Sequence, residues 1–313
     1  MDGRPSGHDP EDDTTSFLRH LPDERYYGMP LNRRPPCHHG KTTLFSDLAL
    51  SRRLERAEGH ACVQFAEARR RLFPDSRAEW IECAGAYAVF DGVASPITQS
   101  FGLGIFEELS AAALESVERF FFVRGAPADH EISPYAGVAA LDLLCAGSYR
   151  PIEISSVMYR SVQNPTAGDR RGVSVHVIRP EESGLFAETS ARAWGHDHSE
   201  LVNVLSTIGM IATAREGSPC FLAEIDGVPG AAASLSIHDG VALFSGSATV
   251  PELRRLGLHA ALLEGRMRYA FDHGCDLAMM VAGAASDSQR NAERKGFRIA
   301  YTRTKWRLSS PPA

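Results

Sequence analysis

The chain carries one unit of helix, glycine and strand twice, and this repeat limits how it can fold. In the first half Gly125 and Gly147 stand 22 positions apart, and in the second half Gly274 and Gly296 have the same spacing. Each second glycine is soon followed by an aromatic residue and an arginine, and both following strands end in another such pair. We interpret this agreement as a tandem duplication. The alternative is a chance likeness, because a glycine commonly ends a helix before a strand.

Hydrophobic periodicity predicts a similar order of elements in both halves. The first half is expected to contain one or two helices over 44–72 that break near Gly59, strands over 80–90 and 97–105, a helix over 110–123, a strand over 130–133, a helix over 138–146 and a strand over 152–160. The second half is expected to contain a strand over 173–178, helical structure over most of 181–215, strands over 221–226, 231–237 and 241–250, a helix over 258–272, a strand over 277–282, a helix over 287–295 and a strand over 297–308. This order predicts an α/β protein with two tandem domains, each a central mixed β-sheet flanked by helices.

Composition indicates where the domains begin and end. Residues 1–40 are polar and rich in Pro, Asp and Arg, which predicts a flexible arm. We expect a first domain over 41–162, a linker over 163–172 and a second domain over 173–313.

Charge and cysteine content exclude several classes of protein. The net charge of -6 argues against nucleic acid as a partner, since duplex binding needs a concentrated basic surface. The 6 cysteines form no C-x-x-C pair, which is typical of free thiols in a reducing compartment. The sequence contains neither an apolar signal region at its start nor an apolar run long enough to span a membrane. We expect a cytoplasmic monomer or homodimer without nucleic-acid or membrane partners.

Two motifs at the end of the arm do not predict sites. Residues 40–43, Gly-Lys-Thr-Thr, resemble the end of a P-loop, but Pro35 stands where that motif needs glycine and no strand precedes it. Residues 37–39, Cys-His-His, have no second cluster at ligand spacing, so we expect no metal site.

The stretch over 247–260 has the pattern of a phosphate-binding loop. A strand is predicted to end at Val250, a basic turn with Arg254, Arg255 and Gly257 follows, and a helix then begins. The N–H groups in the first turn of a helix have no partner within the helix, so they can bind phosphate oxygens. The alternative is a solvated basic turn before a helix.

From Val173 to Leu308 the chain resembles the GNAT superfamily of acyl-CoA-dependent N-acyltransferases. The matching features are the hairpin meander, the loop over 247–260, and a closing helix followed by Gly296-Phe297 and a strand. The loop pattern of the family is Gln or Arg, two residues, Gly, one residue, and Gly or Ala. Arg254 and Gly257 match it, and His259 departs from it at the last position.

The resemblance implies a binding site for acetyl-CoA as co-substrate. The strand before the loop is expected to separate from the strand over 277–282, so that pantetheine lies in the gap and pyrophosphate on the loop. The acetyl group then passes directly, in a ternary complex, to a primary amine, and we expect this acceptor to be a small molecule. The residues assigned to the coenzyme are Ala248, Thr249, Val250, Arg254, Arg255, Leu256, Gly257, Leu258, His259, Ala260, Ser288 and Asn291.

The proton donor does not follow the family pattern. The family often has a tyrosine four residues before its last glycine, and Ala292 stands at that position here. Ser288 and Asn291 share one face of the predicted helix and are assigned as contacts to the coenzyme sulfur or pantetheine. The structural alternative for this segment is a capping box of Ser286 and Gln289.

The general base is open as well. Glu224 is the one carboxylate inside the predicted meander strands, where family bases often lie. His196 belongs to a region that the family uses to cover the acceptor, and it is a second candidate for deprotonating the amine. The alternative for His196 and its neighbours is a solvated helix start capped by Ser199. The candidate catalytic residues are therefore Glu224, Ser288 and His196.

The first half shares the architecture but not the loop. Its strand-to-helix junction carries Glu107 and Glu108 where a pyrophosphate would lie, and like charges disfavour binding. We interpret this half as a degenerate repeat that walls the acceptor site. Two rival functions are a non-catalytic acyl-CoA sensor or scaffold and an interaction module in which both halves are degenerate.

Overall fold

The structure is a computed structural model, and it describes residues 45–93, 95–163, 172–195 and 202–310. The chain from Phe45 onward forms one compact unit. The expected arm and most of the expected linker lie outside the described residues, so the domain boundaries stay predictions. In the described ranges, no helix is long and apolar enough to cross a membrane.

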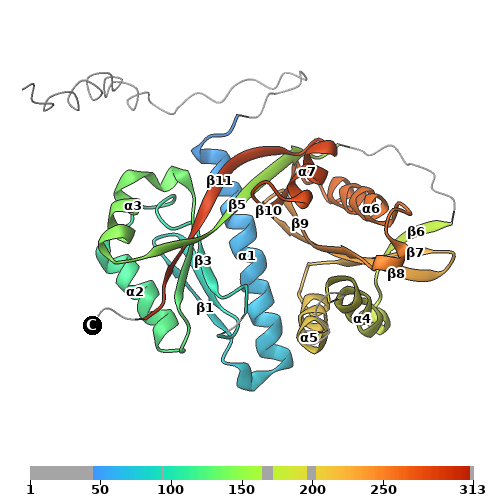
Figure 1. Cartoon of the computed structure of the whole chain (residues 1–313), viewed down its shortest axis with the longest axis horizontal. Coiled ribbons are helices and arrows are strands. Elements are labelled where there is room, and N and C mark those ends of the chain that lie inside the picture. Colours follow the sequence, from blue (N-terminus) through green and yellow to red (C-terminus); the bar gives the residue numbers. More distant parts are fainter. Residues whose placement is uncertain (1–44, 94, 164–171, 196–201, 311–313) are drawn as a thin grey trace, which may run out of the picture. The chain divides into compact units, whose positions relative to one another are not determined.

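The described residues form one mixed sheet of 11 strands that runs through both halves (Figure 1). The strands are β1 (Glu79–Cys83), β2 (Ala86–Phe90), β3 (Gln99–Phe101), β4 (Ala128–Ile132), β5 (Arg150–Ser161), β6 (Val173–Val177), β7 (Cys220–Ile225), β8 (Val228–His238), β9 (Val241–Thr249), β10 (Leu277–Gly283) and β11 (Arg298–Leu308). Their order in space is β1-β2-β3-β4-β11-β5-β10-β9-β8-β7-β6. The pairs β3/β4 and β9/β10 are parallel, and the other neighbours are antiparallel.

The predicted helices are present with small shifts at their ends. They are α1 (Leu48–Leu72), α2 (Ala111–Phe122), α3 (Gly137–Ala146), α4 (Ser183–Trp194), α5 (Val202–Thr213), α6 (Leu258–Asp272) and α7 (Asp287–Arg294). The break expected near Gly59 is wrong, because α1 continues through this residue. A Cβ at Gly59 would come within 2.8 Å of the Tyr87 ring, so the glycine lets β2 approach the helix closely. The strand expected over 80–90 is two strands, joined by a tight turn at Ala84 and Gly85, both with positive φ.

The last strand of each half lies in the sheet of the other half. β5 pairs with β10, and β11 pairs with β4. The order β3-β4-β11 is thus matched by β9-β10-β5, and β5 and β11 lie side by side at the centre (Figure 1). Each half therefore needs a strand from the other to complete its sheet.

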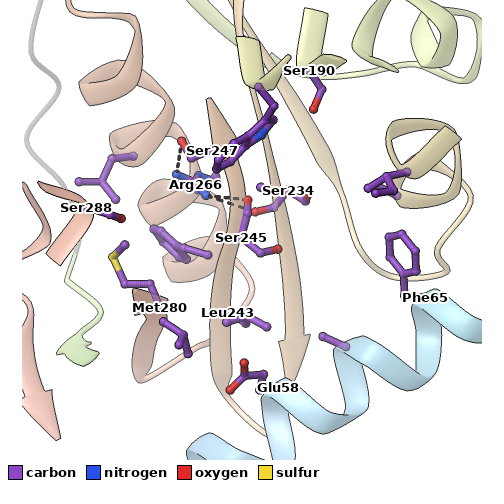
Figure 2. A pocket seen from close by; sticks show the side chains of 18 of the residues that line it. Glu58, Phe65, Ser190, Ser234, Leu243, Ser245, Ser247, Arg266, Met280 and Ser288 are labelled. Carbon is purple, nitrogen blue, oxygen red and sulfur yellow. Dashed lines mark hydrogen bonds between the residues drawn. The ribbon is translucent and has the colours of Figure 1, made fainter. Parts of the chain in front are cut away.

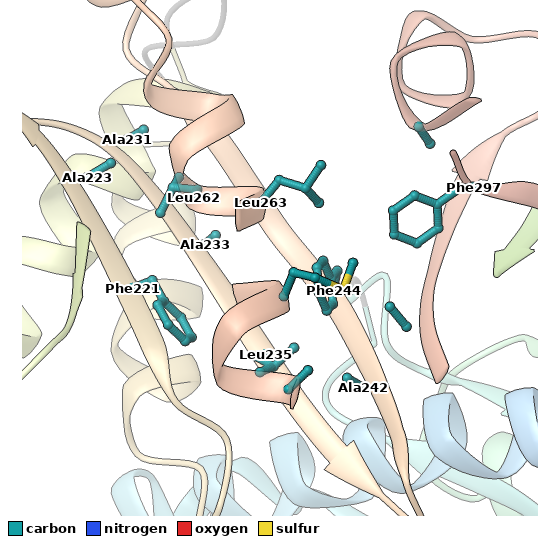
Figure 3. Packing of buried hydrophobic residues seen from close by; sticks show 14 of the residues in the cluster. Phe221, Ala223, Ala231, Ala233, Leu235, Ala242, Phe244, Leu262, Leu263 and Phe297 are labelled. Carbon is teal, nitrogen blue, oxygen red and sulfur yellow. The ribbon is translucent and has the colours of Figure 1, made fainter. Parts of the chain in front are cut away.

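Alternate residues of the second-half strands pack against helices on opposite faces of the sheet. Phe221 and Ala223 of β7 lie in the core with Leu262 and its neighbours on α6 (Figure 3). Cys220 and Leu222 lie in another core with residues of α1, α4 and α5. This period of two is expected for a strand with both faces buried. The second-half sheet is thus covered by α6 on one face and by α1, α4 and α5 on the other.

Candidate functional site

A cavity of about 670 Å³ lies where the second-half sheet opens. One part of its wall comes from β9, β10, α6 and α7, and the other part comes from α1, α4 and α5. Figure 2 shows side chains from these elements converging on the space, including Ser288 and Met280 at one side and Phe65 at the other.

The cavity forms because β9 and β10 separate. Their parallel pairing covers only Val241 to Leu243 opposite Leu277 to Met279. Beyond this point β9 stays paired with β8 as far as Thr249, while β10 stays paired with β5. The facing edges of β9 and β10 therefore have no strand partner in the described sheet, and their residues line the cavity.

A bulge in β9 and a buried arginine shape this edge. The register between β8 and β9 shifts at Gly246, whose φ of 61° lies in the left-handed region. Arg266 of α6 donates hydrogen bonds to the carbonyl oxygens of Ser234 (3.2 Å) and Ser245 (3.4 Å) and to the hydroxyl of Ser247 (3.3 Å). Burial lowers the pKa of Arg266 to about 9, which leaves the guanidinium protonated at neutral pH.

Beyond β9 the chain turns through the loop into α6. Gly257 is the N-cap residue with a φ of 90°, and it has no side chain to accept from the N–H groups of residues 258–260. Arg254 Nε donates to the carbonyl oxygen of Thr249 at 3.3 Å, which ties the loop to the end of β9. Thr249 Oγ1 is buried and has no hydrogen-bond partner within the described part of the chain. A buried hydroxyl without a partner costs free energy, so this atom is open to a further hydrogen bond.

The residues assigned to the coenzyme divide into three groups. His259, Ser288 and Asn291 line the cavity. The side chains of Ala248, Val250 and Leu258 are buried in hydrophobic clusters, so only their backbone atoms are open to a ligand. The remaining residues are Thr249 at the end of β9 and residues of the turn and the start of α6, and the exposed ones among them are Arg254, Arg255 and Leu256.

The environment of His259 disfavours the charged form of its imidazole. Partial burial, then the charges of Arg266 and Lys295, lower the pKa of His259. The imidazole is therefore biased toward its neutral form.

Helix α7 presents polar side chains to the cavity from its first turns. Ser286 is the N-cap residue of α7 and accepts a hydrogen bond from the N–H of Gln289 at 3.2 Å, as the structural alternative predicts. Ser288 takes no part in this cap and lines the cavity. Asn291 Oδ1 accepts from Arg294 at 2.7 Å. Ala292 is buried in the hydrophobic cluster that contains Phe297.

Of the two bases considered from the sequence, only Glu224 lies in the described part of the chain, and it does not line this cavity. Glu224 of β7 lies opposite Ser174 and Pro229 and is not among the residues that line it. His196 lies outside the described residues. The described ranges also contain no group of three or more His, Cys, Asp or Glu residues that could hold a metal ion.

Glu58 is a carboxylate of this site that was not predicted from the sequence. It projects from α1 and is the one acidic side chain among the described residues that line the cavity (Figure 2). Ala61, Cys62 and Phe65 follow it on the same helix face. In the sequence, Glu58 stands at helical spacing from apolar residues that face inward, and this spacing could have predicted that its carboxylate lies in the site.

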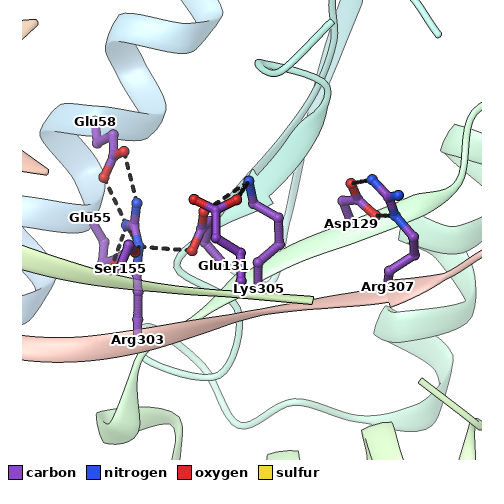
Figure 4. Close-up of polar contacts among 9 residues, drawn as sticks. Glu55, Glu58, Asp129, Glu131, Ser155, Arg303, Lys305 and Arg307 are labelled. Carbon is purple, nitrogen blue, oxygen red and sulfur yellow. Dashed lines mark hydrogen bonds and ion pairs between the residues drawn. The ribbon is translucent and has the colours of Figure 1, made fainter. Parts of the chain in front are cut away.

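A buried ion-pair network holds Glu58 in place (Figure 4). Arg303 of β11 is almost completely buried and lies 2.7 Å from Glu58, 3.1 Å from Glu55 and 3.0 Å from Glu131. Lys305 pairs with Glu131 at 3.4 Å. Lys305 also pairs with Glu153 at 2.9 Å, so four carboxylates share two cations. Burial raises the pKa of Glu55 to about 7, because it outweighs the attraction of Arg303.

The equivalent region of the first half carries a different set of residues. The hydroxyl of Ser100 on β3 lies 2.7 Å from Nδ1 of His130 on β4, and Nε2 of the same ring lies 2.8 Å from the Tyr149 hydroxyl. All three residues are buried, and burial lowers the pKa of His130 to about 3. Glu107 and Glu108 have exposed side chains at the junction before α2.

Comparison with known proteins identifies solved structures with a similar fold. No protein-family model matches the chain, and no curated protein matches it. A GCN5-related N-acetyltransferase from Kribbella flavida matches with 18% identity over 80% of this chain and 96% of its own, at a TM-score of 0.53. One from Sphaerobacter thermophilus matches with 16% identity over 85% of this chain and 95% of its own, at a TM-score of 0.51.

A third solved structure has the same tandem arrangement. It is a tandem GNAT protein from the clavulanic acid biosynthesis pathway, with 13% identity over 73% of this chain and 79% of its own and a TM-score of 0.51. At these identities the likeness concerns the fold, which agrees with the repeat seen in the sequence and with the separated strands of the second half. The protein therefore has the fold of the GNAT superfamily in its tandem form.

Proposed function

We propose that the second half binds acetyl-CoA between β9 and β10 and transfers its acetyl group to a primary amine. The separation of these two strands after Leu243 and Met279 carries the proposal. It leaves the backbone edge of β9 open along the cavity and leads toward the N-terminus of α6. Both are features that a long ligand with amide groups and phosphates would use.

The residues fit such a ligand along its length. We assign Ala248 and Thr249, at the end of β9, to the pantetheine, and the buried Thr249 Oγ1 has no partner among the described residues. The N–H groups of residues 258–260, with Arg255 beside them, suit a pyrophosphate. The coenzyme supplies an acyl group activated as a thioester.

Glu58 is the group placed to take a proton from the amine. A base must lie in the cavity that the acceptor enters, and Glu58 is the carboxylate there among the described residues. Its ion pair with Arg303 fixes the position of the carboxylate. Ser288 lies on the wall from α7 and is the hydroxyl that we assign to the leaving sulfur.

Two measurements test the proposal. Isothermal titration should give heat with acetyl-CoA and with free coenzyme A, and an amine library should contain compounds that release free thiol. Absence of binding up to millimolar acetyl-CoA would overturn the proposal.

One observation favours a second candidate, a non-catalytic acyl-CoA sensor. Ala292 has no proton to donate, and no tyrosine stands among the described residues that line the cavity. The sensor would bind acetyl-CoA with the same residues but release no thiol with any amine.

A further inference from the structure

The part of the cavity lined by α1, α4 and α5 contains a second buried arginine, Arg215, just after α5. Its side chain lines the cavity although the residue is only 8% exposed. Of the carboxylates in the described residues, none pairs with it.

The two arginines of the cavity differ in how their N–H groups are used. Within the described residues, Arg266 donates to four oxygen atoms and fixes the bulge of β9. In the same part of the chain Arg215 donates to two, the carbonyl of Ala212 (3.4 Å) and the hydroxyl of Ser236 (2.9 Å), with the thiol of Cys220 beside them. A guanidinium has five N–H groups, so Arg215 retains donors for a ligand.

The surroundings of Arg215 are neutral. Burial raises the pKa values of the Cys62 and Cys220 thiols, so both stay protonated. The hydroxyl of Ser236, which accepts from the guanidinium, also bonds to the hydroxyl of Ser218 at 3.1 Å. A buried charge without a counter-charge is unfavourable, and a bound anion removes this cost.

The carboxylate of Glu58 lines the same cavity. Glu58 precedes Cys62 by one turn of α1, and both residues line the cavity together with Arg215. Phe65, Phe186 and Ile208 contribute apolar walls to the cavity. A ligand that spans this space meets an acidic group, an apolar surface and a basic group.

We propose that the acceptor is an amino acid with an apolar side chain, whose carboxylate binds Arg215 and whose amine lies at Glu58. This inference rests on the proposed function, because it names the substrate class of the same site. A guanidinium binds a carboxylate through two parallel hydrogen bonds, so the site should reject the same amine without its carboxylate.

The test uses the standard α-amino acids and the amine that each gives on decarboxylation. Thiol release from acetyl-CoA is followed for each pair, and binding to the full chain is followed by the shift in melting temperature. Wild-type protein should favour at least one carboxylated member by tenfold or more in kcat/KM. Arg215→Gln should remove the preference for the carboxylated compound by raising its KM, while kcat/KM for the decarboxylated amine stays the same. Arg215→Lys should restore part of the preference.

Two further variants control for folding. Arg71→Gln removes a half-exposed arginine that binds the neighbouring carbonyl of Ala214, and it should leave the preference intact. Ser236→Ala removes one acceptor that orients Arg215, so it should weaken the preference in the same direction if Arg215→Gln does not fold.

The outcomes separate the two proposals. Equal turnover and equal binding of both members in every pair would overturn the carboxylate site, as would an equal loss for both in Arg215→Gln. If no amine releases thiol but amino acids still raise the melting temperature through Arg215, the transferase proposal fails and the carboxylate site stands.

Discussion

Arg303 on the last strand donates to both carboxylate oxygens of Glu55 on the first helix, at 3.1 Å each, across 248 positions of sequence. The contact joins α1 to the exchanged strand β11 at the point where the two halves meet (Figure 4). Because the same guanidinium also pairs with Glu58, the junction between the halves and the wall of the cavity share one set of charges.

The first prediction concerns stability. Arg303→Met should lower the free energy of unfolding by about 3–5 kcal/mol, since it leaves three buried carboxylates with one cation. Arg119→Met on α2 removes a pair with Glu115 in which the two side chains are 69% and 68% exposed, and it should cost about 1 kcal/mol or less. Urea unfolding of both variants decides the matter, and equal losses would contradict the role given to Arg303.

The second prediction concerns pH. Burial raises the pKa of Glu55 from 4.5 to about 7, so the folded protein holds a proton that the unfolded chain releases between these values. Stability should therefore fall as pH rises from about 4.5 through 7, and then level off for this group. Glu55→Gln should remove this part of the slope. Unfolding measured at several pH values in both proteins tests the effect, and an unchanged slope in Glu55→Gln would refute it.

The third prediction compares the two ends of α6. Gly257 and Gly274 both have positive φ, so alanine at either position should cost about 1–2 kcal/mol of stability. Gly257→Ala should also raise the Kd for acetyl-CoA by about tenfold or more, because a side chain there crowds the N–H groups of the helix start. Gly274→Ala lies at the other end of the helix and should bind normally. Calorimetric titration of both variants distinguishes a local effect from a general loss of stability.

The fourth prediction tests the base. Glu58→Gln should reduce kcat by about 10²- to 10⁴-fold with little change in coenzyme affinity, as expected on losing a general base. Glu224→Gln, the candidate from the sequence, should keep its activity because Glu224 does not line the cavity. The reverse result would restore Glu224 as the base and remove Glu58 from the mechanism.

Much of the fold was predictable because its signals are local. The start of α6 at Leu258 and the cap of α7 at Ser286 follow from hydrophobic periodicity and capping chemistry within a few residues. The equal sequence separation of Gly125 from Gly147 and of Gly274 from Gly296 indicated the repeat. The prediction of a helix break near Gly59 is wrong because this glycine makes room for the side chain of Tyr87, a residue that is distant in sequence.

By itself, the sequence determined the order of the elements, the tandem repeat and the loop that leads into α6, since each depends on residues close together in the chain. Only the tertiary structure decided that β5 and β11 change places, because a strand has the same alternation whichever neighbour it pairs with. It also decided that Glu58 lies in the cavity. A glutamate on an amphipathic helix normally faces solvent, and here Arg303, contributed by the last strand, supplies the charge that stabilises the partly buried side chain of Glu58.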